Sequence, residues 1–347
     1  MSAPLRLALY GTGNVGRAVI DRIARCRDGS LALVHIENSR HEWTDPAAGA
    51  PHVVLDATAS DGVAARHATW LARGVHVVTA NKLGQGTDLA RWRSIESARD
   101  DSGAHYGDSA TVGAGLPVLR TLRALQRGGD GILGFAGVLS GSVAWLLSRH
   151  DGSQPFSQLV RQARDAGYTE PDPRIDLSGE DVRRKLLILA RAAGVAIAPE
   201  DVRVDALSTP VLASAPRADD AALATLDAPL HARLLEARAH DARLHLVARW
   251  SADGGASIAI EALAHDDPLS AGHGTDNRIA IRSARYAAQP LVIQGPGAGA
   301  DITAAAMLDD VFAIRDALRG RQAAGTSTRF ADASAKKVSI DCGRLIA

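Results

Sequence analysis

The sequence predicts an α/β fold with two domains: an N-terminal doubly wound parallel sheet, then an α+β domain with a mostly antiparallel sheet. In the first third of the chain, short apolar strands alternate with helical patterns, as in parallel sheets covered by helices. Beyond Pro199, strand patterns follow one another without long helices between them, which favours antiparallel pairing. We therefore expect domains at residues 1–117 and 118–300, a helix at 301–321 that returns to the first domain, and a loosely ordered tail at 322–347.

A nucleotide-binding fingerprint opens the first domain. The buried strand expected at Leu5 to Tyr10 runs directly into Gly11-Thr12-Gly13-Asn14-Val15-Gly16 and an amphipathic helix to Cys26. Strand, G-x-G-x-x-G and helix in that order allow the backbone to approach a pyrophosphate at the helix N-terminus. The sequence therefore predicts a Rossmann domain.

The second strand, from Leu31 to Ile36, leads to two side chains that favour different cofactors. Glu37 stands where an acid binds the ribose hydroxyls of NAD, whereas Arg40 could hold the 2′-phosphate of NADP. Both are present, so the pattern predicts NAD(H) or NADP(H) without choosing between them.

Two further strands complete the predicted parallel sheet. They span Val53 to Thr58 and Val75 to Ala80, with a helical pattern from Ala64 to Arg73 between them. Thr58 and Lys82 then lie at carboxyl ends of strands, the edge of such a sheet where ligands bind.

The second domain begins after an apolar loop at residues 110–117. We expect a helix from Leu116 to Gln126, a strand from Ile132 to Leu139, and the turn Ser140-Gly141-Ser142, which either caps the next helix or offers amides to a carboxylate. The expected antiparallel strands are Leu244 to Trp250, Ile258 to Leu263, Asn277 to Ile281 and Pro290 to Ile293, followed by a glycine-rich turn at 294–301 and a helix from Ile302 to Arg319.

The stretch at 167–190 carries the main candidate for chemistry. Its two prolines, Pro171 and Pro173, favour an extended polar loop, and Ser178 with Asp181 predicts a capping box at the start of a helix. Asp181 and Lys185 are then neighbours one helical turn apart.

Lysine is scarce in this chain. Of 39 basic residues only four are lysine, at positions 82, 185, 336 and 337. Arginine stays protonated, whereas lysine can donate and recover a proton. Lys185 is thus either a titratable catalytic amine or half of an ordinary exposed ion pair.

Composition excludes several classes of function. The formal net charge is zero and no block of like charges occurs, so we expect neither nucleic acid nor an anionic membrane as partner. No apolar run reaches about 18 residues and no signal sequence opens the chain, which predicts a cytoplasmic protein. Cys26 and Cys342 are too few for a disulfide framework and lack zinc-site spacing.

Together these segments resemble homoserine dehydrogenase, most closely the dehydrogenase half of the fused aspartokinase/homoserine dehydrogenases. The most specific piece is Gly-Tyr-Thr-Glu-Pro-Asp-Pro-Arg at 167–174 with the run Asp-Leu-Ser-Gly-x-Asp-Val-x-Arg-Lys-Leu-Leu-Ile-Leu-Ala at 176–190. Supporting pieces are Gly11 to Gly16, Asn38-Ser39-Arg40, Thr79-Ala80-Asn81-Lys82, Val112 to Pro117, Gly137 to Ser142 and Gly295 to Thr303.

The resemblance implies reversible NAD(P)-dependent reduction of L-aspartate 4-semialdehyde to L-homoserine, on the way to threonine and methionine. It assigns Lys185 as proton donor, with Asp181, Glu170 and Lys82 as further catalytic residues. Substrate contacts would come from Glu170, Asp176, Asp181, Tyr168 and Ser142. Cofactor contacts would come from Gly11, Gly13, Asn14, Val15, Gly16, Glu37, Arg40, Thr58, Lys82, Gly167, Gly297 and Gly299.

The resemblance also implies a monovalent cation, often sodium, held by backbone carbonyls of Ser109, Val112, Ala114 and Leu116. Ser109 departs from the acidic residue usual there, but the implied ligands are backbone carbonyls rather than side chains. It further implies a homodimer joined through the antiparallel sheet. We expect no kinase before Met1 and no amino-acid-binding regulatory domain after Arg321, hence no threonine feedback through such a domain. Glu37 tilts the expected cofactor toward NADH.

Two other functions compete with this one. Aspartate-semialdehyde dehydrogenase handles the same metabolite through a thiolate, but neither Cys26 nor Cys342 has an activating histidine or helix start beside it. A catalytically silent NAD(P)-binding sensor of the same fold is the alternative from another class, and an intact Glu170, Asp181 and Lys185 set argues against it.

Overall fold

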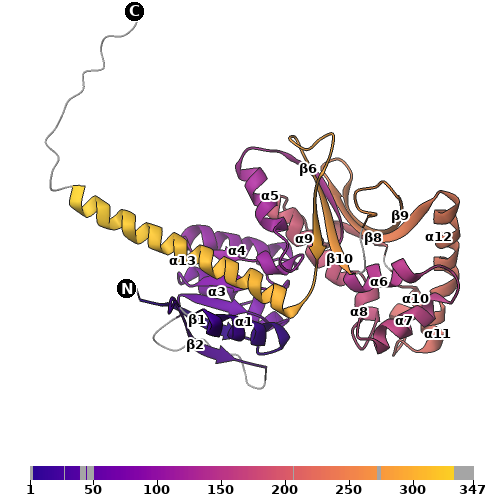
Figure 1. The fold of residues 1–347 in the computed structure, drawn as a ribbon, viewed down its shortest axis with the longest axis horizontal. Helices are drawn as coiled ribbons and strands as arrows, with labels where there is room; N and C mark the ends of the chain where they lie inside the picture. The colour runs from indigo at the N-terminus through magenta and orange to yellow at the C-terminus, as the bar shows by residue number, and fades with distance from the viewer. Residues whose placement is uncertain are drawn as a thin grey trace, which may run out of the picture.

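The computed structural model describes residues 3–26, 28–39, 44, 51–205, 207–271 and 275–331. Two bodies lie side by side, one built from the N-terminal third of the chain and the other from most of the remainder (Figure 1). The α/β fold with a parallel and a mostly antiparallel sheet is confirmed. The exact domain boundaries stay a prediction.

The first sheet is parallel throughout, in the order β2-β1-β3-β4-β5. Its strands are β1 (Leu5–Tyr10), β2 (Leu31–Glu37), β3 (Val53–Asp56), β4 (His76–Thr79) and β5 (Tyr106–Gly107). The helices are α1 (Asn14–Arg25), α2 (Asp61–Ala64), α3 (His67–Ala72) and α4 (Leu89–Ser102). The helical pattern expected at 64–73 thus belongs to two short helices.

Both faces of this sheet are buried because alternate strand residues point to opposite sides. Leu5, Leu7 and Leu9 of β1 pack in one cluster with Val19 of α1 and with Met307 of the last helix, α13 (Ala300–Ala331). Ala8 and Tyr10 point the other way, into a cluster with helices α2 to α4. The carboxyl ends of β1, β3 and β4 are therefore held rigidly side by side.

The second sheet has the order β11-β10-β6-β8-β9-β7, antiparallel except for β7, which runs parallel to β9. Its strands are β6 (Ile132–Val138), β7 (Val202–Asp205), β8 (Ala242–Ser251), β9 (Gly255–Ala264), β10 (Asp276–Ser283) and β11 (Leu291–Pro296). Helices α5 (Val118–Arg127), α6 (Gly141–Arg149), α7 (Phe156–Asp165), α8 (Arg174–Leu177), α9 (Glu180–Ala192), α10 (Pro210–Ser214), α11 (Asp220–Ala224) and α12 (Asp227–Ala239) accompany it, with 3₁₀ turns η1 (Ser109–Thr111) and η2 (Pro199–Asp201). The largest core cluster joins one face of the sheet to these helices.

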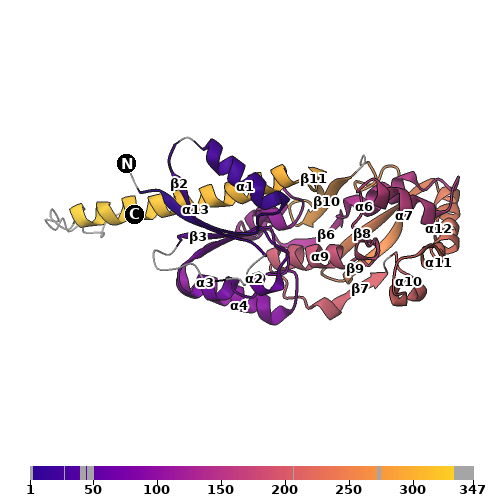
Figure 2. The same cartoon turned by 90° about the horizontal axis from the view of Figure 1, so that it is seen from below.

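Helix α13 (Ala300–Ala331) leaves the second sheet and runs back along the first domain beside α1 (Figures 1 and 2). Helical structure continues ten residues beyond Arg321, so the expected end of regular structure there is wrong. The rest of the expected tail, 332–347, including Cys342, lies outside the described residues.

The predicted capping box at Ser178 is also wrong. Gly179 is the N-cap of α9, with a left-handed φ of 76°, and its missing side chain provides no cap. Ser178 Oγ instead accepts from Glu180 N and donates to Ile175 O. A short helix, α8, ends immediately before, and only a residue that tolerates positive φ allows the chain to turn between the two helices.

No helix in the described part of the chain combines the length and the apolar character needed to cross a membrane. The predicted cytoplasmic location stays a prediction.

Candidate functional site

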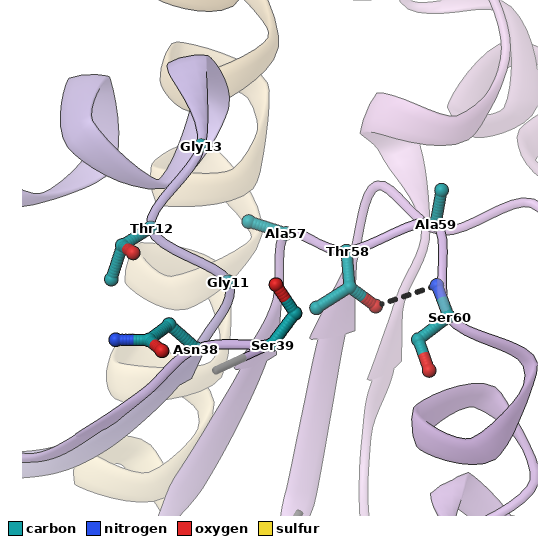
Figure 3. A pocket seen from close by; sticks show the side chains of 9 residues that line it. All are labelled: Gly11, Thr12, Gly13, Asn38, Ser39, Ala57, Thr58, Ala59 and Ser60. Carbon is teal, nitrogen blue, oxygen red and sulfur yellow. Dashed lines mark hydrogen bonds between the residues drawn. The ribbon is translucent and has the colours of Figure 1, made fainter. Parts of the chain in front are cut away.

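A cavity of about 670 Å³ opens at the carboxyl ends of β1, β2 and β3. Gly11, Thr12 and Gly13 line it from the first strand, Asn38 and Ser39 from the second, and residues 57–60 from the third (Figure 3). The fingerprint glycines thus lie where the strand order predicts a dinucleotide.

Two glycines are required by this geometry. Gly11 has φ of 96°, and a Cβ there would lie 2.9 Å from Ala57 O. A Cβ on Gly16 would lie 1.9 Å from Gly11 O, so α1 can pack this closely only without a side chain. Gly13 is the N-cap of α1 and offers no side chain to the first-turn amides, which leaves them available to an anion.

A buried carboxylate, Asp56, supports the floor of the cavity. Its Oδ1 accepts from Thr58 N (2.9 Å) and Thr58 Oγ1 (2.7 Å), and its Oδ2 accepts from Asn81 Nδ2 (3.0 Å). His67 Nε2 lies 3.0 Å from the same Oδ2, and its Nδ1 lies 2.9 Å from Tyr106 Oη. Thr58, a predicted cofactor contact, is therefore fixed by a residue that we did not predict. The signal was available, since Asp56 is a polar residue at the end of an apolar strand.

Glu37 is held by a neighbouring segment. Its carboxylate accepts from Thr44 N (3.0 Å) and from Thr44 Oγ1, and 12% of its side chain stays exposed. It does not line the cavity, although Asn38 and Ser39 beside it do. Arg40 lies outside the described residues. The expected tilt toward NADH stays a prediction.

The second cluster lies where the loop after β4 meets α9. Asp181 bridges two lysines, with Oδ2 2.8 Å from Lys185 Nζ and Oδ1 3.2 Å from Lys82 Nζ. Lys185 Nζ also donates to Leu139 O at the end of β6 (2.6 Å). A backbone carbonyl carries no sequence signal, which is why Leu139 was not predicted.

Lys185 is 9% exposed, so the interpretation as an ordinary exposed ion pair does not hold. Burial lowers the pKa of Lys185, and Asp181 offsets this only in part. Burial would raise the pKa of Asp181, but the ammonium groups of Lys185 and Lys82 hold that pKa well below its usual range. The carboxyl group of Asp181 is therefore ionised at neutral pH, and the ammonium group of Lys185 loses its proton more easily than that of a free lysine.

The predicted substrate residues form a network beside this cluster. Asp176 accepts from Ser142 Oγ (2.7 Å) and from Glu170 N (2.9 Å), so its carboxylate joins α6 to the 168–170 loop. The Tyr168 ring stacks on Trp145 at 4.7 Å and stays 45% exposed. Ser140 caps α6 by accepting from Val143 N, as one of the two expectations for this turn had it.

Several predicted cofactor residues lie away from the cavity lining. Gly297 packs on the Asn277 side chain, and Gly299 precedes α13 with φ of 130°. The described lining of the cavity includes neither of these, nor Asn14, Val15, Gly16, Lys82 or Gly167. Their roles stay predictions.

The predicted cation loop is tightly turned. Gly113 and Ala114 both have positive φ, and Leu116 O accepts from Val118 N. Ser109 is anchored by Asp310 of α13, which accepts from Ser109 N (2.9 Å) and Oγ (2.7 Å). Burial raises the pKa of Asp310 to about 6. Within the described residues no three His, Cys, Asp or Glu side chains form a metal cluster, and the carbonyls of Ser109, Val112, Ala114 and Leu116 stay a prediction.

Comparison with known proteins decides the family. The family model described as homoserine dehydrogenase matches residues 117–312, and its NAD-binding domain matches residues 11–107. The chain belongs to the homoserine dehydrogenase family. It is 36% identical to homoserine dehydrogenase of Saccharomyces cerevisiae over 276 residues, which cover 77% of this chain and 76% of that protein.

Other homoserine dehydrogenase relatives are longer than this chain. Bifunctional aspartokinase/homoserine dehydrogenase 2 of Escherichia coli is 45% identical over 265 residues, which cover 75% of this chain and 32% of that protein. The chain thus spans about a third of these relatives. Among solved structures, a Candida auris protein of unknown function has a TM-score of 0.81 at 29% identity, covering 91% of this chain and 99% of its own.

Proposed function

We propose that this chain catalyses the reversible NAD(P)H-dependent reduction of L-aspartate 4-semialdehyde to L-homoserine, a step toward threonine and methionine. One observation carries the proposal: adjacent residues of a single loop reach both clusters. Asn81 Nδ2 donates to Asp56 Oδ2 and Thr58 Oγ1 at the nucleotide cavity, while Lys82 contacts Asp181 beside Lys185. A nicotinamide cofactor and a proton-donating amine would therefore share one site.

The residues at the cavity fit a dinucleotide. Gly11 and Gly13 leave the α1 amides open, and a Cβ on Gly11 would collide with Ala57 O in the wall of the cavity. When bound, the cofactor supplies the hydride. The remaining work, placing the aldehyde and supplying a proton, falls to the protein.

Lys185 would donate that proton to the carbonyl oxygen of the aldehyde. Two of its three N–H groups point to Asp181 and Leu139 O, which leaves the third for the substrate oxygen. An ammonium also stabilises the negative charge that develops on that oxygen. Asp181 orients Lys185, and Glu170, exposed on the neighbouring loop, would bind the substrate ammonium.

The same assignment extends to a cation and a dimer. Sodium would bind the carbonyls of Ser109, Val112, Ala114 and Leu116, supported by the tight turn at Gly113 and Ala114.

Helices of the same chain cover the sheet face that carries Leu246, Ile258 and Ile279. On the opposite face, Val247 and Leu263 are already buried in a cluster with Leu269. The part of that face that stays open, with Val292 40% exposed, would be covered by a second copy. Light scattering at micromolar concentration should give twice the chain mass, and a fully active monomer would contradict the dimer.

The activity is tested by following nicotinamide absorbance with purified protein, L-homoserine, and NAD or NADP in separate reactions. Turnover with either cofactor is expected. Cofactor binding without turnover would instead support the silent sensor, the alternative function.

A further inference from the structure

Arg191 lies at the C-terminal end of α9 and is 4% exposed. Its Nη1 donates to Gln85 O (2.5 Å), and its Nη2 donates to Thr87 O (2.8 Å) and Ile197 O (2.9 Å). Its guanidinium carbon lies 5.6 Å from the Trp92 ring centroid. Gln85 and Thr87 belong to the first domain, so Arg191 joins the two domains through buried hydrogen bonds instead of contributing a charge to the surface.

Two of the three carbonyls that Arg191 binds, Gln85 O and Thr87 O, belong to the loop that carries Lys82. This loop is internally braced, since Gly86 N donates to Lys82 O (2.7 Å) and Thr87 Oγ1 donates to Leu83 O (2.9 Å). A shift at Gln85 or Thr87 is therefore transmitted to Lys82.

Gly86 shows how closely the loop lies on α9. A Cβ there would lie 3.0 Å from both Arg184 Cβ and Arg184 O, and 2.7 Å from Lys82 O. The loop thus touches α9 at three places: Lys82 on Asp181, Gly86 on Arg184, and two carbonyls on Arg191. Arg191 is about 9 Å along the helix axis from Lys185, too far to touch a substrate held there.

We propose that Arg191 is a positioning residue that docks the loop at 82–87 onto α9 and so fixes Lys82 against Asp181 and Lys185. The proposal rests on the proposed function for its catalytic consequence, although the docking itself does not. Three carbonyls in a fork match a planar guanidinium and not the single ammonium of lysine.

The first test measures docking without activity. Hydrogen–deuterium exchange of the 83–88 amides should rise about tenfold or more in Arg191→Lys and Arg191→Met, because the loop opens locally. Arg183→Met is the matched control: Arg183 is on the same helix but pairs with Glu180 at 2.8 Å. Exchange of these amides in the control should match the parent.

The second test measures the catalytic consequence. In Arg191→Lys, kcat should fall about tenfold to 10²-fold while the Kd for NAD(P)H changes little, because the reacting groups are misplaced and the nucleotide cavity is not. Lys185 is faced by Asp181, Asp176 and Lys82, and Lys82 is the charge that withdraws when the loop opens. The basic limb of the kcat profile should therefore move to higher pH.

Parent-like exchange in both Arg191 variants would overturn the docking. Faster exchange with unchanged kcat and an unmoved basic limb would overturn the positioning role. If Arg191→Met fails to fold, amide exchange in Arg191→Lys decides whether Arg191 docks the loop. Gly86→Ala displaces the same loop at its contact with Arg184, where the added Cβ would collide. A parent without turnover would refute the proposed function, while the exchange result would still decide the docking.

Discussion

Two carboxylates, Asp56 and Asp181, each join several donors, but one is closed and the other open. Asp56 is fully buried, and both its oxygens are occupied by Thr58, Asn81 and His67. Asp181 contacts two ammonium groups, yet 43% of its side chain stays exposed. The first arrangement stabilises structure, and the second leaves room for a ligand.

The two clusters are connected through the loop after β4. Asn81 belongs to the closed network and Lys82 to the open one. A rigid, fully satisfied network can thus hold one end of a loop while the next residue along the chain acts in chemistry.

The largest effect is expected at the open cluster. Lys185→Arg should lower kcat on the order of 10²-fold or more, because the charge is kept while the transferable proton is lost. The circular dichroism spectrum and the NAD(P)H affinity of Lys185→Arg should stay near those of the parent. In the matched control Arg183→Lys, kcat, the spectrum and the affinity should all stay near those of the parent. Near-normal turnover in Lys185→Arg would remove the proton-donor assignment.

At the closed cluster the expected effect is on stability. Asp56→Asn turns one acceptor into a donor that faces buried donors, which should lower the free energy of unfolding by about 2 kcal/mol. Asp61→Asn is the control, because Asp61 pairs with Arg91 at an exposed position and should change stability by less than about 0.5 kcal/mol. Urea unfolding measures both. Equal losses in the two variants would show that the Asp56 network is not special.

Glu37 is an intermediate case, a carboxylate bonded to Thr44 beside the cavity. Glu37→Ala should shift the ratio of kcat/KM values about tenfold from NAD toward NADP, because a carboxylate repels a 2′-phosphate. Parallel assays with both cofactors measure the ratio. If it does not move, the Glu37 carboxylate does not reach the ribose.

Much of the fold followed from periodicity and glycine spacing. Strands β1 to β4, β6 and β8 to β11, and the helix through Lys185, were predicted because their apolar residues recur at strand or helix spacing. The short strands β5 and β7 were not predicted. The capping box failed because Gly179 turns the chain by positive φ, a tertiary need that outweighs the local preference of Ser178. Helix α4 was missed because little of its surface is apolar, with Ile95 its buried residue.

The site was less predictable than the fold. The pairing of Asp181 with Lys185 follows from helix spacing, but the Lys82 contact joins residues about a hundred positions apart. Leu139 acts through its carbonyl, and Arg191 binds carbonyls of another domain. Backbone partners have no residue signature, so only the packed structure identifies them.

The pH dependence of kcat for aldehyde reduction, measured in the parent and in Lys185→Arg, tests whether Lys185 donates the proton. Burial lowers the pKa of Lys185 from its ordinary 10.5, so the protonated donor is lost at a lower pH than for a free lysine. Parent kcat should fall on a basic limb below pH 10.5, and that limb should be absent from the residual activity of Lys185→Arg. The same limb persisting in Lys185→Arg would show that another group donates the proton.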